Sequence, residues 1–288
     1  MIPYDQSLAD QPRSRAGEPR VAILVLGCLL TVYDRCIRAI RATWGSKRVR
    51  GADIFYVYGG QSANTDQEMV DIASLIARAP ARLQDGEVWV SGDIILCGAA
   101  DVREGQENCI LRKRLIAFGY LANQRCYDFI YTVCASSYVD VEELKRYAGT
   151  LPATGVYHGA LQVHGPSGYP FVSGASFLLS RDIAADLADS ADAMLAAYPP
   201  AMPDDVVIGH FIANKHGRES AAAIAERIAV GARPTADQTF VMPYGNGSVD
   251  FVAAPAYSHV PRVKTYHFHF NSQRMWEMEN FHRRFFAE

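Results

Sequence analysis

The strongest constraint on the fold is an alternation of short apolar runs with helical patterns through the first half of the chain. Apolar runs bounded by turn residues favour buried strands, and charges spaced three or four residues apart favour amphipathic helices. The predicted strands are Arg20–Leu26, Asp53–Tyr58, Glu87–Val90, Asp93–Leu96 and Phe129–Val133, and the predicted helices are Tyr33–Trp44, Asp66–Arg78 and Arg103–Asn123. This order predicts an α/β fold with a mostly parallel central sheet, helices on both faces, and a ligand site beyond the carboxyl ends of the strands.

The second half is less regular and predicts a smaller mixed β region. We expect strands at Gly155–His164, Ser176–Leu179, Thr239–Met242 and Thr265–Phe270, and helices at Arg181–Ala197, Asp204–Lys215 and Arg274–Phe286, with 219–231 either helical or loosely packed. Neither an internal repeat nor a Gly/Ser linker divides the chain, so we expect a single domain over residues 19–288 after a disordered polar tail at 1–18.

Composition and charge bear on which partners and which cellular compartment to expect. The chain has 288 residues, 49% of them apolar, and a formal charge of −3. A polyanion-binding protein normally has a basic excess, so no nucleic-acid partner is expected. The longest apolar run, Val21–Leu30, is far below the roughly 18 residues that a membrane span needs. The six cysteines form no C-x-x-C pair, which favours free thiols in a reducing compartment, and we expect a cytoplasmic protein without a transmembrane anchor.

Four segments in a fixed order carry a more specific signal. They are RCIRAIRATWG (35–45), YPFVSGASFLLSRDIAADL (169–187), MPDDVVIGHFI (202–212) and YHFHF (266–270). Together they resemble the β-1,3-glycosyltransferase and Fringe-like family of inverting transferases over residues 20–270. The resemblance implies a nucleotide-binding fold of the GT-A type, with the donor nucleotide held by a half at about 19–140 and the acceptor by a half at about 141–288. Phosphate-loop, dinucleotide, α/β-hydrolase and zincin motifs are absent, which weakens those alternatives.

The chain departs from the family at its metal site. The family places an acidic triplet after the fourth sheet strand to hold Mn²⁺ on the donor diphosphate, and here Cys134, Ala135 and Ser136 stand at those positions. Alanine offers no ligand atom, and a thiol is a soft ligand that suits Mn²⁺ poorly. We therefore predict no metal ligands and turnover without a divalent ion, although Mn²⁺ or Mg²⁺ stays open as a cofactor.

Without a metal, basic side chains would have to stabilise the departing diphosphate. The candidates on helices are Arg38 and Arg41 after the first strand, and a cluster of Arg112, Lys113 and Arg114, of which at most two share a face. A solvated helix face is the competing interpretation for each. Gly27 and Ser136, each following a predicted strand, complete the expected donor contacts.

Inverting transfer needs one general base to deprotonate the acceptor hydroxyl. The resemblance places that base at Asp205, and a second carboxylate at Asp204 would push one pKa of the pair upward. The competing interpretation is that Pro203-Asp204-Asp205 is a helix start with an aspartate as N-cap. Small residues at Ser173, Gly174 and Ala175 would let an acceptor approach the backbone closely.

Two late histidines alternate along a predicted strand, so His267 and His269 face the same side. That pair suits either a phosphate hydrogen bond or a metal ion. We expect an inverting glycosyltransferase that moves a sugar from a UDP-sugar to a hydroxyl acceptor such as a glycan. The alternatives are a catalytically inactive relative that binds a carbohydrate or a partner, and an unrelated nucleotide-dependent α/β enzyme.

Overall fold

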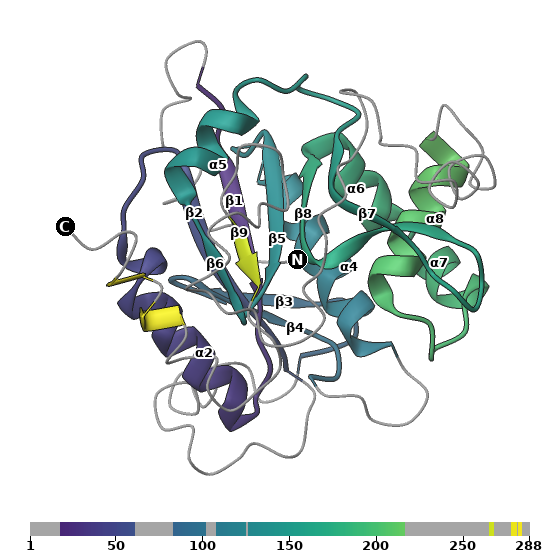
Figure 1. Ribbon diagram of the computed structural model, residues 1–288. Coiled ribbons are helices and arrows are strands. Elements are labelled where there is room, and N and C mark those ends of the chain that lie inside the picture. Colours follow the sequence, from purple (N-terminus) through teal and green to yellow (C-terminus); the bar gives the residue numbers. More distant parts are fainter. Residues whose placement is uncertain are drawn as a thin grey trace.

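The computed structural model describes residues 18–60, 83–101, 108–124, 126–216, 265–267, 278–280 and 282–283. Its centre is a seven-stranded sheet in the order β3-β4-β2-β1-β5-β8-β7, and a second sheet pairs β6 with β9 (Figure 1). The strands are β1 (Val21–Leu26), β2 (Ala52–Gly59), β3 (Val88–Ser91), β4 (Ile94–Cys97), β5 (Phe129–Cys134), β6 (Ser137–Val139), β7 (Tyr157–Val163), β8 (Pro170–Ser180) and β9 (Thr265–His267).

The sheet is mostly parallel, as the sequence predicts. Strands β4, β2, β1 and β5 are parallel neighbours, whereas β3 pairs antiparallel with β4, and β8 pairs antiparallel with both β5 and β7. The second half of the chain therefore extends the same sheet through β7 and β8. The α/β architecture predicted from the alternation of strands and helices is confirmed.

Helices cover both faces because alternate residues of each central strand point to opposite sides. On one face, Val21, Ile23 and Val25 pack in a core with α2 (Thr31–Ala42), the short 3₁₀ helix η1 (Trp44–Ser46) and α5 (Val141–Ala148). On the other face, Ala22 and Leu24 pack in a core with four helices. These are α4 (Cys109–Asn123), α6 (Arg181–Asp189), α7 (Ala191–Ala197) and α8 (Asp204–His216).

Several boundaries differ from those predicted. The long helix begins at Cys109 and not at Arg103, because the Asn108 side chain caps it by accepting from Leu111 N at 3.2 Å. The strand predicted at Ser176–Leu179 starts at Pro170, where a proline costs little because it occupies the first strand position.

The helix predicted at Arg181–Ala197 is two helices. Ser190 ends α6 and begins α7, with φ −95° and ψ 8°. A serine favours helix ends over helix interiors, a signal that the surrounding alanines obscure. The break lets Met194 of α7 reach the core.

Other expectations concern parts of the chain outside the described residues. These are the tail at 1–17, the helix at Asp66–Arg78, the region 219–231, the strand at Thr239–Met242, and most of the elements at Thr265–Phe270 and Arg274–Phe286. The six cysteines are free thiols, and Cys28, Cys36, Cys97 and Cys109 are buried. Among the described helices, none combines the length and apolar character that crossing a bilayer requires.

Helix α8 lies close to β8 because it presents a glycine to it. A Cβ on Gly209 would stand 2.4 Å from Cα and 2.6 Å from Cβ of Phe171, which is closer than atoms can approach without backbone movement. We expect Gly209→Ala to destabilise the protein by about 1–3 kcal/mol through overpacking, despite the better helix propensity of alanine. Urea unfolding measures this, with Gly119→Ala as control, since that Cβ would meet only the Ala188 methyl at 3.1 Å. Equal stability of the two variants would contradict the close approach.

Candidate active site

The candidate site lies at the edge of the sheet where the parallel strands end. Pairing of Leu26 with Cys134 and of Gly59 with Cys97 places the carboxyl ends of these strands at the same edge. Strand β8 runs the other way and pairs with β5 from Ser180 to Ser176, so its first half extends past the last pair, Ser176 with Val133, at the end of β5. The predicted acceptor segment 173–175 therefore lies at the predicted ligand edge.

Asp205 lies in the first turn of α8 and contacts that segment directly. Its Oδ2 accepts a hydrogen bond from Gly174 N at 2.6 Å, and its Oδ1 accepts one from Val206 N at 2.9 Å. A Cβ on Gly174 would stand 2.9 Å from the same Oδ2, so the carboxylate approaches this closely only because the residue is a glycine. The structure thus brings together the predicted base and the predicted acceptor segment.

The surroundings of Asp205 favour its protonated form. Burial raises the pKa of its carboxyl to about 6, and the neighbouring charge of Asp204 adds to this, against the opposing effects of Gly174 N, Arg114 and Val206 N. The residue as a whole, backbone included, is half-buried. A carboxyl that changes charge near neutral pH has the properties of a general base.

Arg114 completes this cluster, although sequence reasoning placed it only within a basic trio. Its guanidinium pairs with Asp204, and Nη2 donates to Gly174 O at 2.9 Å. The residue is 1% exposed and lies over the ring of Phe177, 5.1 Å from the centroid. Arg114 occupies the same helix face as the buried Leu111, Leu115 and Phe118, and a charge on an apolar stripe is the signal that could have identified it.

Lys113 lies at the predicted edge, but its three donors are already used. Nζ donates to Gly27 O at 3.0 Å, to Asp101 O at 2.9 Å and to Asp101 Oδ1 at 3.0 Å. Asp101 also accepts from Gly59 N at 2.6 Å and from Leu29 N. This buried ion pair joins the ends of β1, β2 and β4 to α4. Asp101 was not predicted from the sequence.

The other predicted donor residues lie apart from the Asp205 cluster. Arg38 pairs with Asp34 at 2.8 Å on the surface of α2. Arg41 pairs with Asp93, just before β4, at 2.9 Å and covers the Tyr56 ring at 4.7 Å. Gly27 follows β1 and packs against Tyr58, where a Cβ would stand 2.7 Å from Cε1.

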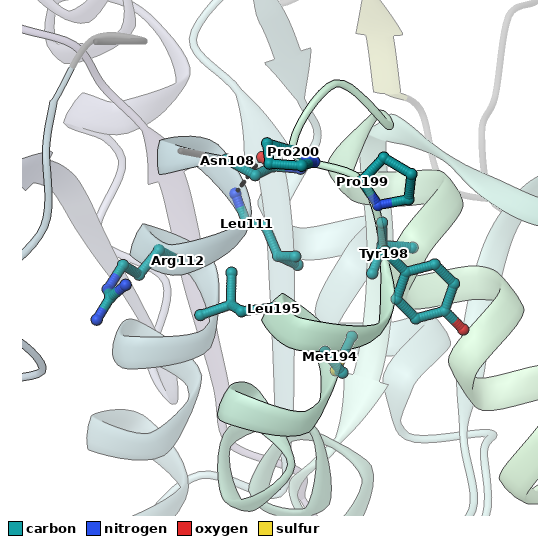
Figure 2. Close-up of a pocket in the computed structure, with 9 residues that line it drawn as sticks. Asn108, Leu111, Arg112, Met194, Leu195, Tyr198, Pro199 and Pro200 are labelled. Carbon is teal, nitrogen blue, oxygen red and sulfur yellow. Dashed lines mark hydrogen bonds between the residues drawn. The ribbon is translucent and has the colours of Figure 1, made fainter. Parts of the chain in front are cut away.

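Arg112 is one of the residues that line a separate cavity of about 200 Å³ (Figure 2). Its guanidinium pairs with Asp85, which does not line the cavity. The cavity lies between α4, α7 and the start of α8, and its other lining residues are Asn108, Leu111, Met194, Leu195, Tyr198, Pro199, Pro200 and Val207.

The residues at the family's metal position do not fit a hard divalent cation. The thiol of Cys134 donates to Gly174 O at 3.2 Å, and Ala135 and Ser136 are buried. In the described part of the chain, no three His, Cys, Asp or Glu side chains gather as a metal ion would need. His267 pairs through the backbone with Ser137, which brings it beside Ser136, while His269 lies outside the described residues.

Comparisons with known proteins give no close relative. No protein-family model and no curated protein sequence matches the chain. Among solved structures it is similar to the galactosyltransferase LgtC in complex with donor and acceptor sugar analogues, with 9% identity and a TM-score of 0.32 over 65% of this chain and 69% of that one. A likeness this distant assigns no activity to this chain.

Proposed function

We propose that this protein is an inverting glycosyltransferase in which Asp205 is the general base. The observation that carries the proposal is the contact between the Asp205 carboxylate and Gly174 N at the carboxyl edge of the sheet. Supporting it is the raised pKa of that carboxyl, to about 6, in a residue that is half-buried as a whole. The acceptor hydroxyl would bind beside the 173–175 segment, give its proton to Asp205 as it attacks the anomeric carbon, and displace a nucleoside diphosphate from the opposite face of the sugar.

The donor class rests on the sequence resemblance, which favours a UDP-sugar. The backbone of His267 pairs with Ser137, the residue after Ser136, and this junction at the start of β6 is our candidate for the diphosphate. Since Cys134 and Ala135 replace two carboxylates, we propose that the diphosphate leaves without a resident divalent ion. The cytoplasmic location and the glycan acceptor remain predictions from the sequence.

Donor hydrolysis and transfer test the proposal directly. The purified chain is incubated with a panel of UDP-, GDP- and ADP-sugars, with and without EDTA, and release of the nucleoside diphosphate is measured. We expect release from a UDP-sugar that persists in EDTA, and NMR of a transfer product should show a β-linkage. If EDTA abolishes the activity and Mn²⁺ restores it, the proposal that turnover needs no divalent ion is refuted, while the assignment as a glycosyltransferase stands.

The alternative is a non-catalytic protein that binds a carbohydrate or a partner. The replacement of the acidic triplet by Cys134, Ala135 and Ser136 favours it, because a protein that only binds has no need of carboxylates that hold a metal ion for catalysis. Calorimetry with UDP separates the two functions. Absence of UDP binding, together with no product from any donor of the panel, would favour the alternative over the transferase.

A further inference from the structure

The backbone of Gly174 is held on both sides of its Cα by charged side chains. Its N–H donates to Asp205 at 2.6 Å, and its carbonyl accepts from Arg114 Nη2 at 2.9 Å and from the Cys134 thiol at 3.2 Å. Arg114 also pairs with Asp204. One guanidinium therefore contacts the strand and the partner carboxylate directly, and it reaches the candidate base through the backbone of a single residue, Gly174.

We propose that Arg114 is the positioning residue of this site, which neutralises Asp204 and fixes the backbone of Gly174 so that Asp205 is the carboxylate that exchanges a proton. The proposal rests on the proposed function for its catalytic meaning. The effect of Arg114 and Asp204 on the pKa of Asp205 concerns only the cluster, and it can be measured on an inactive protein as well.

The charges of the cluster support this division of roles. Two carboxylates share one guanidinium, and Asp204 takes the direct ion pair while Asp205 receives N–H groups only. Among the described residues, two further titratable groups belong to this cluster: the Cys134 thiol on β5, which contacts the same Gly174, and Tyr157 on β7, which interacts electrostatically with Asp205. Burial raises the pKa of Tyr157, so its phenol stays neutral over the range in which Asp205 titrates.

The placement of Arg114 is costly, which argues against a merely structural residue. Its Nε is buried and has no hydrogen-bond partner among the residues that the structure describes, and a buried donor of this kind costs about 1–3 kcal/mol. An apolar residue on this helix face would pack against Phe177 without that cost. The arginine instead supplies a fixed positive charge beside the two carboxylates.

The proposal predicts pKa shifts of opposite sign for two variants. Arg114→Gln removes the positive charge, so the pKa of Asp205 should rise by about 1–3 units. Asp204→Asn removes the like charge and leaves Arg114 to act on Asp205, so the pKa should fall by at least about one unit. The double variant restores the balance of charges and should titrate near the wild-type value, and Arg114→Lys should stay within about half a unit of it.

Carbon-13 NMR titration of the Asp205 carboxyl measures these shifts in the full chain, after circular dichroism has shown each variant to be folded. Arg146→Gln is the matched control, because that arginine is 71% exposed and its pair with Glu143 lies on α5. Its titration should equal that of the wild type. Should Arg114→Gln fail to fold, Asp204→Asn and Arg114→Lys still test the proposal.

The pH profile of kcat/KM gives the second readout. Because the base must be unprotonated, activity rises with pH through the Asp205 pKa, and this limb should move upward in Arg114→Gln and downward in Asp204→Asn. A common loss of activity with an unmoved limb and unmoved NMR titration would overturn the role of Arg114. If the NMR titrations move as expected but no donor is turned over, the electrostatic inference stands and the transferase assignment fails.

Discussion

Replacement of Asp205 by asparagine should lower kcat of sugar transfer by about 10²–10⁴. Asparagine has nearly the same shape, and its carbonyl oxygen can still accept the Gly174 N–H bond, but it cannot take a proton from the acceptor. Steady-state kinetics with the productive UDP-sugar measures the loss. KM should change far less than kcat, since the change removes the base and leaves the binding surface in place.

Asp182→Asn provides the control for this change. Asp182 also accepts a backbone N–H bond from a glycine, Gly155, at 3.0 Å, but it lies on the exposed start of α6. This variant should keep the wild-type kcat. Near-normal turnover by Asp205→Asn would show that Asp205 is not the general base, whichever nucleotide-sugar is the donor.

Lys113→Met should destabilise the fold by about 3–5 kcal/mol. The change leaves the carboxylate of Asp101 buried without its cation, and an uncompensated buried charge costs several kcal/mol. It also removes the hydrogen bond to Gly27 O, which joins β1 to α4. Urea unfolding followed by circular dichroism gives the free energy of unfolding and should show a lower midpoint with an unchanged slope.

Arg146→Met tests the specificity of that result. Arg146 pairs with Glu143 on the exposed side of α5, and such surface pairs contribute at most about 1 kcal/mol. A loss in Lys113→Met no larger than in Arg146→Met would mean that the Lys113–Asp101 pair does not hold the carboxyl edge together.

The sequence predicts the fold best where each element carries its own pattern. The continuous apolar run of β1 and the regular charges of α2 identify both elements to within a few residues. Prediction fails where the pattern depends on neighbours. Strand β8 contains Ser173 and Gly174, which interrupt its apolar run, and only its pairing with β7 and β5 makes it eleven residues long.

The residues of the candidate site likewise fall into those that their own segments identify and those that only the fold identifies. Asp205 and Gly174 could be selected from their segments, but their 2.6 Å contact joins positions 31 residues apart and depends on how α8 packs on β8. The roles of Lys113 and Arg114 could not be separated from sequence, because adjacent helix residues point about 100° apart and different partners decide each one. Asp101 carried no motif at all, and its importance follows from Lys113, Gly59 and Leu29 converging on it.

The antiparallel pairing of β8 with β5 has a consequence for how proteins of this architecture can diversify. The predicted donor half ends at about residue 140 and the acceptor half begins at about 141. Five residue pairs join β5 of the first half to β8 of the second, and β9 of the second half pairs with β6 of the first. Recombination between Asp140 and Val141 would therefore have to match hydrogen-bond register as well as side-chain packing. New acceptor preferences should arise more readily by point substitution along 173–175 than by exchange of whole halves.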